Sequence, residues 1–189
     1  MDGVKLVKLV LKEFGPQPQK KLQKLAYLAE IEYIKKHGKR LSDLSFKRYY
    51  YGPYSEDIKN IEDLEEDIGI IEDHKTSGYH IKESSLISGD KYESIVKEKV
   101  ANEVISLIKQ YSRKSGKELE KIADNTEPFL ETEEMNDPID LNSYAWFYSL
   151  LNSKHFWEEA EKKDKENREK NVYGKHVIRD ESELDELFS

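Results

Sequence analysis

Apolar residues recur at helical spacing near the start of the chain and predict two consecutive helices. The first covers about residues 3–14, and the GPQPQ segment from Gly15 to Gln19 ends it because proline cannot continue a helix. The second ends at His37-Gly38, where the preceding lysines suit the negative end of the helix dipole. One apolar face of this helix is formed by Leu22, Leu25, Ala26, Ala29, Tyr33 and Ile34.

An alternating, aromatic-rich stretch from Ser45 to Tyr51 predicts a short strand, which Gly52-Pro53 interrupts. In such a strand Tyr49 and Tyr51 share one face, and Tyr50 takes the other. One face should belong to the core. We therefore expect at least two of the four tyrosines in the YYYGPYS segment to be structural, with their hydroxyls bonded at the core edge.

A third helix is predicted after this turn, because Ser55 is a good N-cap and acidic residues follow it. Its narrow apolar stripe continues to Gly69, which should close the helix. The short segments IIED and YHIK then predict two strands of a hairpin, with Gly78 at the turn.

The second half of the chain has the pattern of a helical protein. An amphipathic stripe predicts a helix of about 20 residues between Tyr92 and Tyr111, and a shorter helix follows at 117–124. Residues 126–140 read as an acidic loop with prolines. The LNSYAWFYSLLN segment, residues 141–152, is apolar almost all round and predicts a buried helix, and Ser153 starts a last helix that becomes highly charged from Glu158.

These elements predict a mainly α protein with a small β-hairpin, of the α+β class. Helix, helix, strand, helix and hairpin is the order of a winged-helix module, which we place at residues 3–88. A helical annex at 89–160 is expected to pack on it. Residues 161–189 form a charged helix end and tail that we expect to project into solvent or to be disordered.

Composition narrows the class of protein. The chain contains no cysteine, which excludes disulfides, cysteine-ligated zinc and thiol catalysis. Its 189 residues hold no apolar run that approaches 18 residues, so we expect a soluble, cytoplasmic protein. Abundant Lys, Glu, Tyr and Ile with few Gln is a composition also found in thermophiles.

The net charge of −8 conceals an uneven distribution. Residues 1–54 carry 12 basic and 5 acidic groups, whereas residues 55–90 carry 3 and 11. Residues 126–189 carry 8 basic and 17 acidic groups. An anionic partner should therefore meet the first quarter of the chain, and a cationic partner should meet an acidic segment.

Motifs for enzyme chemistry are missing from the sequence. It has no Gly-rich phosphate loop, nucleophile elbow or zinc-protease helix. His74 and His80 would lie near each other across the hairpin, but exposed positions explain them without a metal. Adjacent carboxylates such as Glu133-Glu134 are typical of a solvated face. We expect no catalytic residue, no metal and no cofactor; an unrecognised enzyme is the weakest alternative.

Binding of nucleic acid is the natural alternative for a winged helix, and here the charges oppose the usual mode. The third helix reads SEDIKNIEDLEED, with seven acidic groups and one lysine, so DNA would repel it. A regulator that binds nucleic acid would instead use a basic N-terminal surface, with tyrosine stacking. Its residues would be Lys20, Lys21, Lys24, Lys39, Arg40, Lys47 and Arg48.

The segments KLQKLAYLAEIEYIKKHGKRL and FKRYYYGPYSEDI resemble the signature of Panacea-type domains, the SocA-like antitoxin family or a closely related winged-helix-like family. The matching positions are Lys21, Leu22, Gln23, Lys24, Leu25, Tyr27, Gly38, Lys39, Leu41, Tyr51, Gly52 and Pro53, and we add Ser55 to this structural signature. A weaker similarity covers Glu118 to Thr132. There Asn125 stands where the family usually has His, and Phe129 stands where it has Trp.

The resemblance implies an antitoxin-like or regulatory module that is not an enzyme and that binds a partner protein, such as a toxin. A homodimer is also compatible with the sequence, and no membrane partner is expected. The acidic third helix and the tyrosine turn are the candidate partner-binding surface, because an acidic element suits a basic partner. Its residues would be Tyr49, Tyr51, Tyr54, Glu56, Asp57, Glu62, Asp63 and Glu66.

Overall fold

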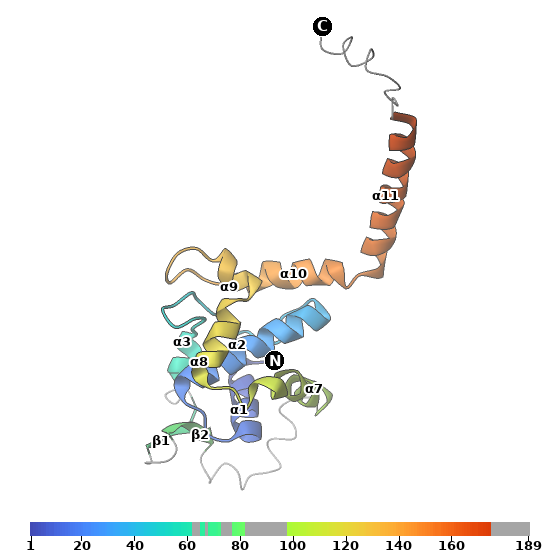
Figure 1. Ribbon diagram of the computed structural model, residues 1–189. Coiled ribbons are helices and arrows are strands. Elements are labelled where there is room, and N and C mark those ends of the chain that lie inside the picture. The colour runs from blue at the N-terminus through green and yellow to red at the C-terminus, as the bar shows by residue number, and fades with distance from the viewer. Residues whose placement is uncertain (62–64, 67, 73–76, 82–97, 175–189) are drawn as a thin grey trace. The chain divides into compact units, whose positions relative to one another are not determined.

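The computed structural model describes residues 1–61, 65–66, 68–72, 77–81 and 98–174. The chain divides into two compact units, Met1–Asn152 and Ser153–Ser189. The first unit is mainly helical and has one two-stranded antiparallel sheet, which confirms the predicted fold class (Figure 1). The described part of the second unit is helix α11, Lys154–Gly174. The predicted domain boundaries and the winged-helix arrangement stay predictions.

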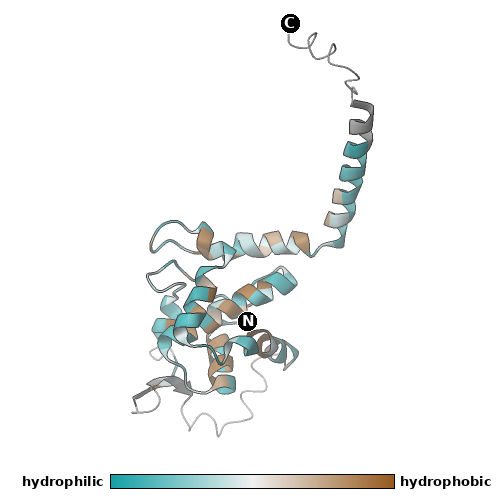
Figure 2. Cartoon of the chain, viewed as in Figure 1, coloured by the Kyte–Doolittle hydropathy of each residue, from teal (hydrophilic) through white to brown (hydrophobic). Residues whose placement is uncertain are grey.

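Helix α1, Gly3–Phe14, confirms the first predicted helix. The Asp2 side chain caps its N-terminus by accepting a hydrogen bond from Val4 N, and Gly15 ends it. Its apolar face is completely buried at Leu6, Val7 and Val10. Figure 2 shows hydrophobic segments along α1, the helix below the N-terminal label.

Helix α2, Gln19–His37, is the central element of the first unit and contacts α1, α7, α8 and α10. It ends as predicted at Gly38, which adopts the left-handed conformation and donates its N–H to Ile34 O. The predicted single buried face is wrong. Every residue from Leu22 to Ile31 is buried, because other helices cover α2 on several sides.

A buried carboxylate fixes the chain after α2. Glu30 is fully buried and accepts hydrogen bonds from the main-chain N–H groups of Leu41 and Ser42, from the Ser42 hydroxyl, and from Arg40 Nε. Such a group must be fully hydrogen-bonded to be tolerated in a core. Glu30 therefore sets the path of the chain that leads to the tyrosine segment.

The strand predicted for Ser45 to Tyr51 does not form. Lys47 makes isolated bridges with Tyr54 and Pro138, and residues 50–52 form a turn. The third helix does not continue to Gly69 as predicted, because Gly69 lies in a strand. Helix α3 covers Glu56–Lys59 and Ile61 is again helical, whereas residues 62–64 and 67 lie outside the described residues. The alternating pattern of this aromatic-rich stretch was misleading, because its aromatic residues form a turn rather than a strand of a sheet.

Strands β1, Ile68–Glu72, and β2, Ser77–Ile81, confirm the hairpin. Gly78 does not form its turn, which lies outside the described residues together with His74. Gly78 pairs with Ile71, and its φ of 148° and missing side chain let Gln17 approach. A Cβ at this position would overlap Gln17 O, so the glycine is explained by close packing on the α1–α2 linker.

The helices after the hairpin complete the first unit. They are α7, Glu98–Ile108, the 3₁₀ helix η1, Lys109–Tyr111, α8, Gly116–Asp124, α9, Glu127–Glu131, and α10, Leu141–Leu151. The predicted helix at 117–124 is confirmed, whereas the predicted acidic loop contains the short helix α9. Residues 92–97 of the predicted long helix lie outside the described residues.

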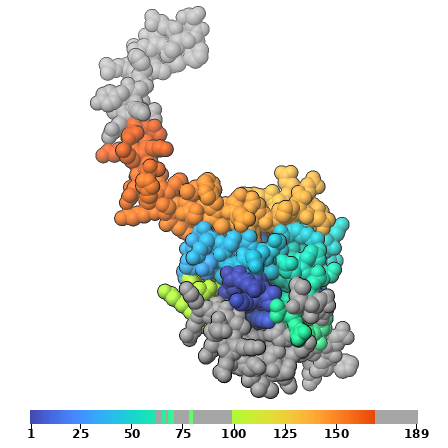
Figure 3. Space-filling view, turned by 180° about the vertical axis from the view of Figure 1, so that it is seen from behind, coloured from blue at the N-terminus to red at the C-terminus, as the bar shows by residue number. Residues whose placement is uncertain are grey.

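The composition of α10 predicted a helix buried on all sides, and this prediction is wrong. Leu141, Tyr144 and Ala145 pack toward α2, but Trp146 and Phe147 are 65% and 47% exposed. Figure 3 shows the α9–α10 segment as a layer along one side of α2. Among the described helices, none combines the length and the apolar content that a membrane span requires.

Candidate functional site

The segment from Lys47 to Ser55, here called the tyrosine turn, is closed by main-chain hydrogen bonds. Lys47 N donates to Tyr54 O at 2.8 Å, and Tyr54 N donates to Lys47 O at 3.0 Å. Inside this pair, Gly52 N donates to Tyr49 O at 3.0 Å. The turn is therefore a closed loop that presents its tip to solvent.

Gly52 is required at this tip for two reasons. Its φ of 86° is unfavourable for any residue with a side chain. A Cβ would also overlap Asp124 Oδ1 and would come within 3.1 Å of Lys24 Cε. The glycine thus lets the main chain of the turn lie directly on α2 and α8.

The side chain of Gln23 connects α2 to the far end of the turn. Gln23 Nε2 donates to Ser55 O, and Ser55 N donates to Gln23 Oε1, both at 2.8 Å. Gln23 is 2% exposed and Ser55 is 1% exposed, so no water competes for these groups. Ser55 is the N-cap residue of α3 as predicted, although its hydroxyl makes no capping hydrogen bond.

Lys24 anchors the middle of the turn from below. Its Nζ donates to Pro53 O at 2.7 Å, and burial lowers its pKa to about 8, against the opposing effect of Asp124 and Glu120. Burial raises the pKa of Asp124, and Lys24 opposes that change. Asp124 Oδ1 is buried and accepts no hydrogen bond within the described part of the chain. The turn thus rests on the buried Lys24, with the half-buried Asp124 of α8 close enough to act on its charge.

Lys20 extends this charged cluster to the surface. Its Nζ lies 2.6 Å from Glu120 Oε2 and 4.2 Å from the centre of the Tyr51 ring. The cation therefore joins an ion pair to a cation–π contact. This contact fixes one face of the Tyr51 ring and leaves the other face open to solvent, since the residue is 61% exposed.

The four tyrosine rings of the turn divide into two on the surface and two at the edge of the core, which is compatible with the prediction that at least two are structural. Tyr50 is 72% exposed, and Tyr49 and Tyr54 are half-buried. The Tyr49 ring contacts Tyr50 at 5.3 Å and Tyr54 at 5.0 Å between ring centres. The Tyr54 hydroxyl donates to Glu56, and burial, then Glu56, raises its pKa to about 12.

Two pockets border the turn. A small one of about 140 Å³ lies at its base, and it is lined by Gln19, Lys20, Gln23, Lys24, Tyr49, Tyr51, Gly52 and Tyr54. A second, of about 310 Å³, lies on the other side and is lined by Ser45, Phe46, Lys47, Tyr54, Glu56, Asp57, Asn136 and Pro138. Tyr54 belongs to both.

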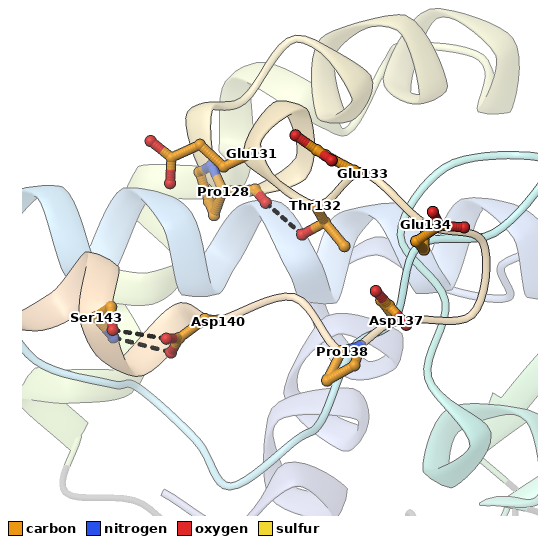
Figure 4. Close-up of a pocket in the computed structure, with 9 residues that line it drawn as sticks. All are labelled: Pro128, Glu131, Thr132, Glu133, Glu134, Asp137, Pro138, Asp140 and Ser143. Atoms are coloured by element: carbon orange, nitrogen blue, oxygen red, sulfur yellow. Dashed lines mark hydrogen bonds between the residues drawn. The ribbon is translucent and has the colours of Figure 1, made fainter.

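A larger, acidic groove of about 500 Å³ follows the segment that joins α9 to α10 (Figure 4). Pro138 belongs both to this groove and to the second pocket of the turn. Asp140 forms the end of the groove at α10, where its carboxylate accepts hydrogen bonds from the main chain and the hydroxyl of Ser143. The lining residues are Pro128, Glu131, Thr132, Glu133, Glu134, Asp137, Pro138, Asp140 and Ser143.

Arg48 joins the turn to this acidic segment. Its Nη1 donates to the carbonyl oxygens of Phe129 and Thr132, both at 2.8 Å, and its guanidinium lies 4.5 Å from the centre of the Phe129 ring. The Arg48 main chain pairs with Asn136 N and with Asp137 O. Phe129 is thus an aromatic platform for an arginine.

The predicted partner-binding residues do not all come together. Tyr49, Tyr51, Tyr54, Glu56 and Asp57 lie on or beside the turn, and Glu66 is exposed farther along the chain. Glu62 and Asp63 lie outside the described residues. The pKa of Glu56 is lowered, chiefly by its hydrogen bond with Lys47 at 2.8 Å. This pair partly neutralises the acidic surface that the sequence predicted.

Most cations of the predicted nucleic-acid surface make contacts within the chain. Lys24 is buried, and Lys21 Nζ donates to Ser112 O at 2.8 Å. Arg40 contacts Glu30, while Lys39 is exposed. Lys20, Lys47 and Arg48 have the partners described above. These contacts favour internal roles, and a nucleic-acid surface stays a prediction.

The sequence pattern of the antitoxin SocA-like family, Panacea domain, matches residues 22–128. The chain belongs to this family. The Panacea match begins at the first buried residue of α2 and includes the tyrosine turn and α8. It therefore contains Gln23, Lys24, Gly52 and Asp124, the residues that hold the turn. No curated protein and no solved structure matches the chain.

Several residues of this region of the Panacea protein were not found by sequence reasoning. Asp124 and Glu120 support Lys24 and Lys20 from α8, about 100 residues later in the chain. Trp146 and Phe147 had been placed in the core. Helical spacing could have indicated that these two rings are exposed, because residues 143, 146, 147 and 150 share one face of α10.

Proposed function

We propose that this Panacea protein is an antitoxin-like module that binds a partner protein through the tyrosine turn, and that it is not an enzyme. The observation that carries the proposal is a pair of exposed aromatic rings, Tyr50 and Tyr51, on a main chain held by buried contacts. Tyrosine is enriched at binding hot spots because a large ring buries much area with little loss of freedom.

The anchoring beneath the turn favours recognition over catalysis. Gln23, Lys24 and Gly52 direct their contacts to the main chain of the turn or to α8, rather than toward an open cleft. A rigid loop loses little conformational entropy when it binds, so more of the contact energy remains as affinity. Family membership supports a toxin as the partner.

The test is co-expression with the toxic product of a neighbouring gene. We expect the full-length chain to restore growth and to co-purify with that product. The variant Tyr50→Ala/Tyr51→Ala should lower affinity at least tenfold, because two hot-spot rings are removed. Failure of the full-length chain to restore growth or to form any complex would contradict the proposal.

A matched control removes two exposed aromatic residues from the other unit. Phe156→Ala/Trp157→Ala deletes rings that are 37% and 52% exposed on α11. This variant should restore growth as well as the wild-type chain does. Equal melting temperatures of the two variants would show that loss of rescue comes from the binding surface and not from unfolding.

A further inference from the structure

Helix α10 carries an exposed face that is both aromatic and continuous with the acidic groove. Ser143 lines the groove, and Trp146 and Phe147 follow it by three and four positions, so all three lie on one side of the helix. Leu150 continues the row and is half-buried. Two adjacent exposed aromatic rings that continue a concave groove form a contiguous surface of the kind that marks interaction sites.

The groove gives this face a definite charge. Five carboxylates line it, and its lining contains no lysine or arginine. Two arginines lie nearby, but Arg48 binds main-chain carbonyls and Arg40 binds Glu30 and Leu44 O. The five are Glu131, Glu133, Glu134, Asp137 and Asp140, and Figure 4 shows them spread along the rim and the far end of the groove.

We propose that the acidic groove and the Trp146–Phe147 face form one docking surface for a basic amphipathic helix of a partner protein. Lysines or arginines of the partner would lie in the groove, and its apolar residues would cover Trp146 and Phe147. Since α10 has 11 residues and is about 16 Å long, it offers contacts to three turns of such a helix.

This proposal rests on the proposed function in one respect: the partner is taken to be a protein. It adds the chemistry of that partner and a surface outside the family match, since the face lies at residues 131–150 and the match ends at residue 128. Pro138 joins the groove to the pocket beside Tyr54, so a partner can span both the turn and the groove.

A second copy of this chain suits the surface less well. The apolar face of the lysine-rich helix α1 is buried in its own core. The described side chains of helix α11, residues 154–168, are mostly exposed, but they mix lysines with glutamates and aspartate. Neither offers the combination of free apolar face and uniform positive charge that the groove would attract.

Fluorescence locates the binding event, because the chain has only two tryptophans. In a Trp157→Phe chain the emission comes from Trp146 alone. The probe is an 18-residue helical peptide of leucine, alanine and lysine, with leucines on one face. We expect its binding to shift Trp146 emission to the blue at low salt and to weaken steeply as salt is added. A peptide with glutamate in place of lysine should cause no shift.

Anisotropy of the labelled lysine peptide then measures affinity in a set of charge variants. The groove variant, Glu131→Gln/Glu133→Gln/Glu134→Gln/Asp137→Asn, leaves the Asp140 cap intact and should weaken binding at least tenfold. The matched control, Glu158→Gln/Glu159→Gln/Glu161→Gln/Asp164→Asn, removes the same charge from α11 and should change binding less than twofold. The variant Trp146→Ala/Phe147→Ala should also weaken binding at least tenfold.

Three results would overturn the proposal. They are equal binding of the lysine and glutamate peptides, equal loss in the groove and control variants, and self-association of the full chain that depends on Trp146 and Phe147. The third would assign the face to a second copy, and light scattering after size exclusion detects it. A fourth result, no binding of the lysine peptide by a full chain that still restores growth, would refute this surface and leave the proposed function intact. Intact peptide binding without rescue would refute the proposed function instead.

Discussion

The side-chain amide of Gln23 forms two hydrogen bonds with the main chain of Ser55, which follows 32 positions later. Both residues lie within the part of the chain that matches the Panacea domain, residues 22–128. The pairing explains why a glutamine on α2 accompanies a Gly-Pro-Tyr-Ser turn. Its side-chain amide supplies the donor and the acceptor that the buried main chain of Ser55 needs. It is a structural partnership that positions the exposed tyrosines.

Replacing Gln23 by leucine should destabilise the protein by about 2–3 kcal/mol, because the buried N–H of Ser55 would lose its partner and the C=O of Ser55 would keep only its hydrogen bond from Lys59 N. Urea denaturation followed by circular dichroism measures the change. Gln110→Leu is the control, since Gln110 is exposed and its change should stay within about 0.5 kcal/mol. Equal values for the two variants would show that the Gln23–Ser55 pair contributes nothing specific.

Gly52→Ala should cost about 2–4 kcal/mol, because it combines a positive φ with an overlap at Asp124 Oδ1. Thermal unfolding should show a melting temperature lower by several degrees. Gly116→Ala provides the comparison, since its Cβ would meet nothing within 4 Å at the start of α8. That variant should be neutral or slightly more stable, and a similar loss at both sites would contradict the close approach described here.

The stability of the protein should rise between pH 8 and 10 because of Lys24. Its pKa is about 8 in the folded chain and 10.5 ordinarily, so in this window the unfolded chain holds a proton that the folded chain has lost. Unfolding then becomes less favourable as pH increases. The full shift corresponds to about 3 kcal/mol, and part of it is gained by pH 10.

Comparison with Lys24→Met isolates this effect. The free energy of unfolding of the wild-type chain, minus that of the variant, should rise with pH from 8 to 10 and stay flat between pH 6 and 7. Tyr27, Tyr54 and Tyr111 have raised pKa values and reduce stability above about pH 10, but they do so in both chains and cancel. A difference independent of pH would show that Lys24 is charged alike in both states.

Arg48→Lys should loosen the start of the acidic segment and cost about 1–2 kcal/mol, because lysine cannot keep both hydrogen bonds and the stacking on Phe129. Hydrogen exchange should become faster at residues 129–139. Arg113→Lys, at an exposed position, should leave exchange unchanged. Unchanged exchange in the Arg48 variant would mean that main-chain pairing alone holds this segment.

The helices were predictable wherever one local pattern sufficed. Spacing of apolar residues placed α1 and α8 within a residue of their observed bounds, and Gly38 marked the end of α2. The same reasoning failed at Ser45–Tyr51, because alternation of aromatic residues is shared by strands and by exposed turns. It failed at Gly78 as well, because the reason for that glycine lies in Gln17, which is distant in sequence.

The sequence predicted several residues of the candidate site but not the contacts that they make. The tyrosines of the turn and the basic residues of α2 were recognised, but their roles were not. Lys24 and Arg48, taken as a surface for nucleic acid, contact carbonyl oxygens of this chain. Those carbonyls become available only after the turn and α9 have folded, and no local pattern encodes their position.

By itself the sequence determined the class of the protein, its family and the positions of several helices, because helix periodicity, breakers and a contiguous signature are local properties. The tertiary structure decided which polar groups are buried and which aromatic rings are exposed. Lys24 lies under the turn because several helices enclose α2, and Trp146 is exposed because, within the described part of the first unit, α10 packs on α2 through its opposite face. Burial depends on what the rest of the chain places alongside each residue.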